Sequence, residues 1–543
     1  MVFGEISGFE EETYMNYELY KHEEITDLKH LLSCCAEKYH THTVFRYQEK
    51  TEIVEITYSQ FKKDVEALGT FLLEKGHRNC KIAVLGENSY AWIVTYFAAA
   101  CGKNIVVPLD KDLLVKDVAE LLLHSECRVL FYSHTYSDIA EALQNTEIEG
   151  LICYNLKHLP TMITEGETLV KKGKCEYVDR KIQKQDVASI VYTSGTTGKS
   201  KGVLLTHYNL CSCARAACEN VLCEGVSFLV LPLHHTYGLV TSVFSMMNYG
   251  VPIYINKSLK RLVQEFPKAK PQNIFAVPLM VEMLYKNIWN QARAQGREKS
   301  LQRLVKVSDV LLKCKIDLRK VFFKSIRLAL GGELELIISG GAPLDEVYIK
   351  GFKSFGITVL NGYGITECGP VVAVNRNCFS VSGSVGMPLS CNQVRISEEG
   401  EILVKGDNVT PGYYRNEEEN KKSFTKDGWF KTGDLGKIDE YGALHITGRI
   451  KNLIILSNGK NISAEAIESQ IYTIPYVKEV IVYGKNDKIT AEVYLDEKIS
   501  DARNLLKKDI QQINRRLPQI QNIGDIIIRD TEFPKTSTKK IKR

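Results

Sequence analysis

The sequence predicts an α/β protein with a large N-terminal domain of layered α/β subdomains, a small β unit, and a small C-terminal α+β domain. Its 543 residues exceed the size at which one hydrophobic core stops growing, so at least two domains are expected. Short β-branched runs alternate with helix-length segments between Lys81 and Gly364. After Gly383 the pattern changes to short strands broken by Gly, Asn and Asp.

One connecting helix can be followed residue by residue. Thr57 is the expected N-cap and Gly76 the expected end, because a hydroxyl accepts from the first free N–H groups and glycine terminates helices. The residues expected on its buried face recur at helical spacing and are Phe61, Val65, Leu68 and Leu72.

The alternating region predicts parallel α/β layers, because strands separated by helices commonly pair in parallel. Its expected strands are, in order, "KIAVLGEN", "NIVVPL", "RVLFYS", "ASIVYTSG", "SFLVLPL", "VPIYIN", "NIFAVP" and "LELIISGG".

The rest of the chain predicts two smaller parts. Residues 383 to 449 are expected to form the small antiparallel β unit, which belongs to the N-terminal domain. A helix in "SAEAIESQIYTI" and two strands, "VKEVIVYG" and "KITAEVYL", indicate a separate α+β domain. The domains are therefore expected to span residues 1–450 and 451–543.

Composition narrows the class of protein. Hydrophobic residues make up 44% and charged residues 25%, the balance of an ordinary globular protein. The acidic N-terminus lacks the basic and apolar regions of a signal peptide, and the apolar run from Ala91 to Cys101 is too short to cross a bilayer. The fifteen cysteines include no C-x-x-C pair, so buried reduced thiols and a cytoplasmic location are expected.

The excess of basic over acidic residues is concentrated near the C-terminus. The net charge is +5, and the segment "PKTSTKKIKR" ends the chain. A nucleic-acid arm is one interpretation of this segment, but no aromatic residues interleave its charges. A solvated or phosphate-binding tail is favoured, and no nucleic-acid partner is expected.

The segment "IVYTSGTTGKSKGV", Ile190 to Val203, is a candidate phosphate loop. It fails the P-loop pattern G-x-x-x-x-G-K-[ST], because Thr193 stands where the first glycine is required. Its hydroxyls, small residues and lysines can still surround phosphate oxygens with donors and positive charge. A surface turn is the alternative.

This segment resembles the phosphate loop of the acyl-adenylate-forming (AMP-binding) superfamily. Four further segments match motifs of that superfamily in the right order: "NGYGITECGP", "GWFKTGDLG", "GRIKNLIILSNGKNIS" and the terminal "PKTSTKKIKR". The resemblance covers nearly the whole chain. Three stretches look most like long-chain fatty acyl-CoA ligases: "FAVPLMVEMLYKNIWNQ", the basic segment ending in "LRKVFFKSIRLALGG", and "DGWFKTGDLG".

The resemblance implies an ATP-dependent acid–thiol ligase. A medium- or long-chain fatty acid attacks the α-phosphate of ATP, pyrophosphate leaves, and coenzyme A converts the acyl-adenylate into a thioester with release of AMP. Mg²⁺ is the implied metal. The alternatives are an acyl-carrier-protein ligase and an aryl- or amino-acid adenylating enzyme. A non-catalytic relative is disfavoured, because Lys540 and Glu367 are present.

The resemblance also assigns roles to residues of the nucleotide site. Tyr363 would face the adenine, Thr366 would contact the α-phosphate, and Glu367 would bind Mg²⁺. The β- and γ-phosphates would be held by Thr193, Ser194, Gly195, Thr196, Thr197, Gly198 and Lys201. Backbone approach to the nucleotide and acyl group would involve Asn361, Gly362, Gly364, Gly340, Gly341 and Ala342.

Four more residues complete the expected site. Asp434 would accept both ribose hydroxyls, and Arg449 would reach the same sugar or the phosphate. His235 matches a family histidine beside the acyl carboxylate, although a histidine taken alone is more often structural. Lys540 would bridge the carboxylate and the α-phosphate during adenylation.

The C-terminal domain is expected to be a mobile lid. Lys451 falls at the family's hinge, and Gly459 would line the path of the thiol. Three residues depart from the family pattern: Ser200 and Ala464 replace prolines, and Lys539 replaces a glycine. None of these changes removes a reacting group, so activity is expected.

The basic segment from Lys286 to Arg327 has two interpretations. It can hold the protein on anionic membranes, where fatty acids partition, or it can be a solvated helical face.

Overall fold

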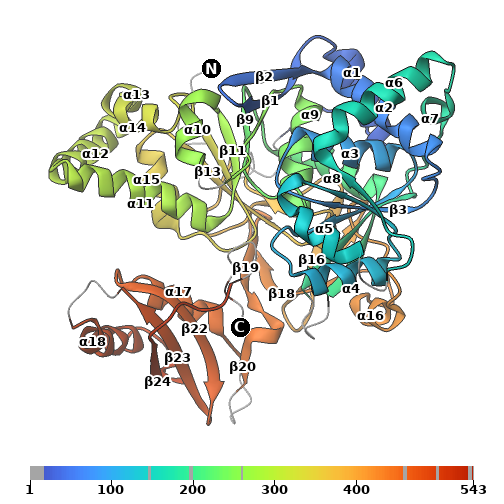
Figure 1. Cartoon of the computed structure of the whole chain (residues 1–543). Coiled ribbons are helices and arrows are strands. Elements are labelled where there is room, and N and C mark those ends of the chain that lie inside the picture. Colours follow the sequence, from blue (N-terminus) through green and yellow to red (C-terminus); the bar gives the residue numbers. More distant parts are fainter. Residues whose placement is uncertain are drawn as a thin grey trace. The chain divides into compact units, whose positions relative to one another are not determined.

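The computed structural model describes residues 18–144, 148–194, 200–258, 261–455, 461–496, 501–535 and 541. The chain forms two compact units (Figure 1). The first comprises Met1–Gln393 and Val404–Phe424, and the second comprises Val394–Leu403 and Thr425–Arg543.

The first unit contains a six-stranded sheet in the order β6-β5-β3-β4-β7-β8. Its strands pair in parallel except for the antiparallel pair β7 and β8. This confirms the predicted parallel layer. The bounds are β3 Lys81–Leu85, β4 Ile105–Leu109, β5 Val129–Tyr132, β6 Ile152–Asn155, β7 Val187–Ser194 and β8 Ser200–Thr206.

A nine-stranded sheet in the order β15-β14-β13-β12-β11-β9-β10-β1-β2 lies in the same unit. Its centre, from β1 to β13, is parallel, whereas β2, β14 and β15 pair antiparallel at the two edges. The bounds are β1 Thr43–Glu49, β2 Glu52–Thr57, β9 Ser227–Leu229, β10 Ile253–Ile255, β11 Asn273–Ala276, β12 Leu336–Ser339, β13 Thr358–Gly364, β14 Val371–Val374 and β15 Met387–Pro388.

Helices cover these sheets. The N-terminal group is α1 Leu28–Lys38, α2 Tyr58–Glu74, α3 Tyr90–Cys101, α4 Val115–Ser125, α5 Ser137–Gln144, α6 Leu159–Lys171 and α7 Glu176–Asp179. Then come α8 His207–Asn220, the π-helix η4 Tyr237–Ser245, α9 Met246–Tyr249 and α10 Leu262–Ala269. The remainder are α11 Pro278–Ala294, α12 Glu298–Lys313, α13 Arg319–Phe322, α14 Lys324–Ala329, α15 Glu346–Ser354 and α16 Glu417–Ser423.

Helix α2 confirms the prediction made from its sequence. The Thr57 side chain accepts a hydrogen bond from the Gln60 N–H at 3.1 Å, and Gly76 follows the helix with a positive φ of 86°. The predicted apolar face is fully buried. The apolar run that precedes Gly102 is the core helix α3, whose residues from Trp92 onward are all buried.

The second unit is built on two sheets and a short β pair. Strands β16 Asn392–Ile396, β17 Glu401–Gly406, β18 Phe430–Ile438 and β19 Leu444–Arg449 form a four-stranded sheet, with β18 antiparallel to β19. The start of β16 and the end of β17 are grouped with the first unit. Strands β20 Leu453–Ile455 and β21 Asn461–Ser463 pair with each other. Strands β22 Val477–Lys485, β23 Lys488–Leu495 and β24 Ile523–Arg529 form a three-stranded sheet, accompanied by α17 Ala464–Tyr472 and α18 Ala502–Asn514.

The second unit includes residues that precede the expected boundary at 450. Ser463 donates from its Oγ to the Thr447 carbonyl at 2.8 Å, which ties the start of α17 to β19. Of the expected β unit, Val394–Leu403 and residues 425–449 cluster with the C-terminal part, whereas residues 383–393 and 404–424 cluster with the first unit. The hinge at Lys451 stays a prediction.

The cysteines are all free thiols. Cys211, Cys213, Cys218 and Cys223, which lie in α8 and the turn after it, are buried. Burial raises the pKa of the Cys213 thiol to about 12, which suits an inert core residue. Within the described residues, no helix is long and apolar enough to cross a membrane.

Candidate active site

An apolar cavity in the first unit is the centre of the candidate site. Helix α8 and the turn after it contribute Cys218, Val221 and Cys223, and η4 contributes Tyr237 and Thr241. The strand ends contribute residues that the sequence predicts to contact the nucleotide and acyl group: Gly340, Gly341, Gly362, Tyr363 and Gly364. The described residues that line this cavity include no charged side chain.

The topology of the sheet brings the two glycine-containing segments together. Strands β12 and β13 are parallel neighbours, with Ser339 opposite Asn361, so the segments that follow them emerge at one edge of the sheet. Gly341 has a φ of 85°, which favours glycine. A Cβ on Gly364 would lie 2.0 Å from the Pro370 carbonyl oxygen, so this position has no room for a side chain.

Tyr237 closes one wall of the cavity. Its hydroxyl donates to the Ile338 carbonyl at 2.9 Å, and a Cβ on Gly340 would meet the Tyr237 ring at 2.9 Å. Burial raises the pKa of Tyr237, so the hydroxyl stays protonated as a donor. A side chain at position 340 would therefore collide with the Tyr237 ring, so the position requires glycine.

Glu367 lies in the short 3₁₀ helix Thr366–Cys368 and is oriented by a residue that sequence reasoning missed. The Tyr413 hydroxyl donates to Glu367 Oε1 at 2.8 Å. Burial, and then the charge of Glu367, raise the pKa of Tyr413, so the tyrosine remains a donor. The only signal in the sequence is the aromatic pair that follows "NVTPG".

Lys201 lies beside the same tyrosine. Its ammonium pairs with Glu419 and sits 5.5 Å from the centroid of the Tyr413 ring. A phosphate that binds Lys201 therefore competes with Glu419 for the ammonium. Tyr413 thus contacts both the expected metal ligand and the expected phosphate-binding lysine.

The hairpin of β7 and β8 carries the expected phosphate loop. Thr193 pairs with Lys201 and Ser194 with Ser200 across the antiparallel ladder. The remaining loop residues of this prediction, Gly195, Thr196, Thr197 and Gly198, lie outside the described residues, as do Gly459 and Lys540. Ala342 is exposed and is not among the residues that line the cavity.

In the second unit, Asp434 and Arg449 form a cross-strand pair. They face each other in the β18–β19 ladder, and Arg449 Nε lies 2.7 Å from Asp434 Oδ1. The Asp434 side chain is 3% exposed, which argues against an ordinary exposed turn. The ion pair fixes the carboxylate that the sequence assigns to the ribose.

His235 lies in the loop between β9 and η4. Its backbone N–H donates to the Pro232 carbonyl at 3.2 Å, and its backbone carbonyl accepts from the Leu239 N–H at 3.1 Å. The imidazole of His234 lies beside it, with the ring centroids 4.2 Å apart. The histidine predicted to face the acyl carboxylate is therefore one of a pair.

Comparison with protein families decides what this arrangement belongs to. The profile of AMP-binding enzymes matches residues 33–414, and that of the AMP-binding enzyme C-terminal domain matches residues 466–540.

The chain belongs to the AMP-binding enzyme family.

Two relatives and one solved structure illustrate how this AMP-binding enzyme compares. It is 30% identical over 453 residues to the long-chain-fatty-acid–CoA ligase FadD15 of Mycobacterium bovis, covering 79% of this chain and 75% of the relative. It is 28% identical over 534 residues to fatty acyl-CoA synthetase B of Dictyostelium discoideum, covering 88% and 77%. The ATP-bound RpMatB-BxBclM chimera B1 has the same fold, with a TM-score of 0.77 and 24% identity over 95% of this chain and 97% of the chimera.

Proposed function

We propose that this AMP-binding enzyme activates a medium- or long-chain fatty acid with ATP and transfers the acyl group to coenzyme A. The acid's carboxylate attacks the α-phosphate of ATP, pyrophosphate leaves, and the thiol then displaces AMP. The observation that carries the acyl specificity is the cavity that Tyr363 helps to line, whose described lining is mainly apolar and includes no charged side chain. Burial of methylene groups there stabilises a fatty acyl chain by about 0.8 kcal/mol for each CH₂.

The same cavity argues against an amino-acid substrate. A buried ammonium without a carboxylate partner is strongly unfavourable, and the described lining includes no Asp or Glu. An acyl carrier protein remains the alternative acceptor, because its phosphopantetheine arm presents the same thiol as coenzyme A.

Within this proposal the residues take separate roles. The backbone approaches the nucleotide closely at four glycines, Gly340, Gly341, Gly362 and Gly364. Tyr363 offers a flat face to the adenine. Thr193 and Ser194, at the end of β7, lead into the phosphate loop. Thr366 contacts the α-phosphate and His235 the acyl carboxylate.

The remaining roles concern the metal and the second unit. Glu367, oriented by Tyr413, supplies a carboxylate oxygen of the kind that Mg²⁺ prefers. Asp434 binds the ribose and Arg449 holds its carboxylate. Lys540 stabilises the charge that develops during adenylation, Lys451 is the hinge, and Gly459 lines the thiol path.

A pyrophosphate-release assay over a panel of acids, with and without coenzyme A, tests the function. Saturated fatty acids of increasing length are compared with aryl acids and amino acids. We expect pyrophosphate release with fatty acids and a thioester only when coenzyme A is added. Preference for an aryl or amino acid would refute the acyl assignment, and transfer only to a carrier protein would refute the acceptor.

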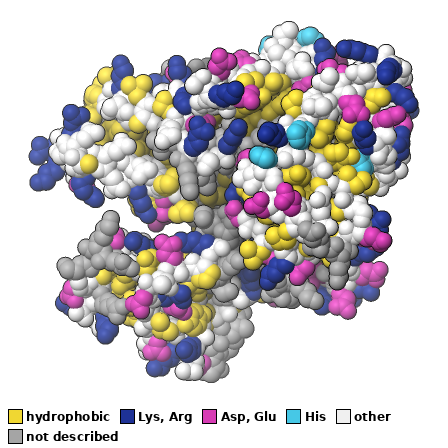
Figure 2. All heavy atoms as spheres, viewed as in Figure 1, with side chains coloured by type: hydrophobic (Ala, Val, Ile, Leu, Met, Phe, Trp, Pro, Cys, Tyr) yellow, Lys and Arg dark blue, Asp and Glu magenta, His cyan; other side chains and the backbone are white. Residues whose placement is uncertain are grey.

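We also propose that the enzyme contacts anionic membranes through α12. The side chains of Arg303, Lys306, Val307 and Val310 share one exposed face of this helix, and the two valines are 50% and 60% exposed. Basic side chains interspersed with apolar ones are typical of helices that lie on membrane surfaces. Figure 2 shows dark blue and yellow side chains together at the left, where Figure 1 labels α12.

Charge balance supports this surface. Residues 286 to 327 contain 12 Lys and Arg against 3 Asp and Glu. Arg303 and Lys306 make no ion pair within the described part of the chain, whereas Arg319 pairs with Asp317 and Lys320 with Glu335.

Co-sedimentation with liposomes tests the membrane contact. Vesicles with an anionic lipid should retain the protein at low salt and release it as salt rises. Lys306→Glu/Val310→Glu should weaken retention, whereas Lys350→Glu, on an exposed lysine of α15, should weaken it less. Equal binding of neutral vesicles, or no binding at all, would contradict the proposal.

A further inference from the structure

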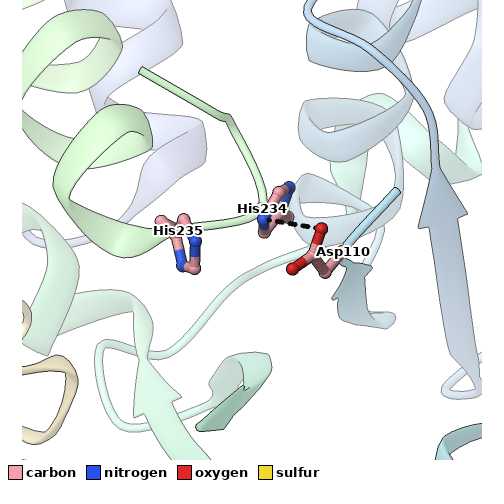
Figure 3. A group of neighbouring side chains, drawn as sticks. All are labelled: Asp110, His234 and His235. Carbon is pink, nitrogen blue, oxygen red and sulfur yellow. Dashed lines mark ion pairs between the residues drawn. The ribbon is translucent and has the colours of Figure 1, made fainter. Parts of the chain in front are cut away.

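Three potential metal ligands from two sheets meet in the first unit (Figure 3). Asp110 directly follows β4 of the six-stranded sheet, and His234 and His235 follow β9 of the nine-stranded sheet. One ligand atom from each residue lies within 4.8 Å of the other two. In Figure 3, His234 lies between Asp110 and His235. The cluster therefore combines two imidazoles with one carboxylate.

The buried His234 ring shows that this cluster is more than a surface coincidence. Its side chain is 5% exposed, and its buried Nε2 makes no hydrogen bond. That atom lies 3.4 Å from Asp110 Oδ1, a contact without hydrogen-bond geometry. Buried polar atoms without a hydrogen bond are rare and require an explanation.

The loop that carries the two histidines is held in place. Asn88, in the segment after β3, donates from Nδ2 to the Leu231 carbonyl at 2.9 Å and accepts from the Leu233 N–H at 3.1 Å. The loop is thereby fastened to the sheet that carries Asp110. A preorganised set of ligands loses less conformational freedom on binding an ion.

We propose that Asp110, His234 and His235 form a site for one divalent transition-metal ion with the preferences of Zn²⁺. Two ligand atoms, each about 2.1 Å from a tetrahedral ion, are about 3.4 Å apart, which matches the separation of 3.4 Å between His234 Nε2 and Asp110 Oδ1. Imidazole nitrogens favour Zn²⁺, Co²⁺ and related ions over Mg²⁺, which prefers oxygen ligands.

The protonation state of His234 suits this role. Burial lowers the pKa of the imidazole, with the charge of Asp110 acting in the opposite direction. A neutral imidazole has a lone pair for a metal ion, whereas an imidazolium has none. Three protein ligands leave the fourth tetrahedral position for water or an oxygen of a substrate.

Occupation of the site would affect the reaction, and this consequence rests on the proposed function. His235 would be fixed on the metal and withdrawn from the acyl carboxylate that it is proposed to face. Zn²⁺ is then an inhibitor that binds separately from the Mg²⁺ required by ATP.

Titration of the whole metal-free protein with Co²⁺ tests the site. Co²⁺ bound by nitrogen and oxygen in a four-coordinate site gives strong visible ligand-field bands, whereas cysteine ligands add an ultraviolet charge-transfer band. We expect one Co²⁺ per chain, the visible bands without the thiolate band, and displacement by Zn²⁺.

Two variants and one control assign the ion to this cluster. Asp110→Asn and His234→Gln should each weaken Co²⁺ binding by more than roughly tenfold. His445→Gln should leave it unchanged, because His445 pairs with Asp439 at 2.8 Å in the second unit. Asp110→Asn preserves the side-chain shape, so it tests the site even if His234→Gln is poorly folded.

The outcomes separate the metal site from the proposed reaction. Absence of Co²⁺ binding, a thiolate band, or full binding by Asp110→Asn would overturn the metal site, whatever the enzyme catalyses. If Co²⁺ binds as expected, inhibition of fatty-acid activation by Zn²⁺ should be relieved in Asp110→Asn. Binding that leaves activation unchanged would remove the inhibitory role.

Discussion

Tyr413 joins two residues whose roles the sequence predicts from separate motifs. Its hydroxyl donates to Glu367 and its ring lies under the ammonium of Lys201. An oriented carboxylate binds a cation with less loss of freedom than a mobile one. The tyrosine is therefore a positioning residue for the expected Mg²⁺ ligand.

Substitution of Glu367 and Tyr413 should affect Mg²⁺ dependence to different degrees. Glu367→Gln removes the charged ligand, and we expect acid-dependent ATP–pyrophosphate exchange to fall on the order of a hundredfold. Tyr413→Phe removes one hydrogen bond to a carboxylate, worth about 1.5 kcal/mol or more. The Mg²⁺ concentration for half-maximal exchange should then rise about tenfold. Exchange is measured across a Mg²⁺ titration.

The neighbouring tyrosine is the matched control. Tyr414 donates to Glu126 at 2.8 Å rather than to Glu367, so Tyr414→Phe should leave the Mg²⁺ titration unchanged. Full activity of Glu367→Gln at limiting Mg²⁺ would show that Glu367 is not the ligand.

At the scale of single residues, the sequence predicts which type of residue a site needs better than it predicts which side chains contact one another. The glycines of "NGYG" are predictable from the close approach they permit, and Gly364 indeed leaves no room for a Cβ. The contact of Tyr413 with Glu367 spans 46 positions along the chain, and no motif encodes it. Likewise, the sequence singles out His235 but not the ring of His234 beside it.

At the scale of elements, the start of α8 is tied to the start of α1 through a histidine. His207 is 1% exposed, and its Nδ1 accepts from the Leu28 N–H at 3.3 Å. Burial lowers the pKa of His207 from 6.5 to about 4, opposed by the charges of Asp27 and Asp186. Protonation of Nδ1 would break the link between the two helices.

This histidine should make stability depend on pH. Between pH 6.5 and about 4 the unfolded chain binds more protons at this position than the folded chain. Its contribution is therefore fully present above pH 6.5 and is lost as the pH falls. From pH 7 to pH 5 the free energy of unfolding of the first unit should decrease by about 2 kcal/mol.

Urea unfolding at several pH values measures this effect. His207→Gln should lower stability at pH 7 and flatten the dependence between pH 7 and pH 5. His40→Gln, at an exposed position, should preserve the dependence of the parent protein. An equally steep loss in His207→Gln would contradict the assignment.

Elements with regular periodicity were predictable, and those set by distant contacts were not. Thr57, the apolar face of α2 and Gly76 determine one helix locally. The π-helix η4 has the same apolar composition as an α-helix, so its wider turn follows from its packing in the core rather than from its residues. The antiparallel β14 and β15 at the sheet edge likewise follow from where the chain returns.

At the scale of the whole molecule, the chain divides into a large unit with the apolar cavity and a smaller one with Asp434 and Arg449. The sequence predicts such a division but places it at residue 450, directly before the expected hinge Lys451. The β18–β19 hairpin instead clusters with the smaller unit, through contacts such as that of Ser463 with Thr447. The division into compact units follows from which residues pack together, whereas a hinge is the place about which two parts move, so the two boundaries can differ.

The proposed hinge at Lys451 predicts that the two half-reactions can be damaged separately. Lys540 and the segment "SNGKNIS" both follow Lys451 in the chain and are proposed to serve one step each. Lys540→Ala removes the cation needed while pyrophosphate departs, so ATP–pyrophosphate exchange should fall on the order of a hundredfold or more. Thioester formation from supplied acyl-adenylate should survive.

Gly459→Leu should have the reverse effect, because its side chain would fill the proposed thiol path. Exchange should stay near that of the parent enzyme, while thioester production from the same acyl-adenylate falls. Both variants are assayed for both half-reactions, with Lys485→Ala, at the end of β22, as the control that changes neither. Equal damage to both steps in Lys540→Ala, or loss of exchange in Gly459→Leu, would contradict the division of labour, because each step would then need both parts of the small domain at once.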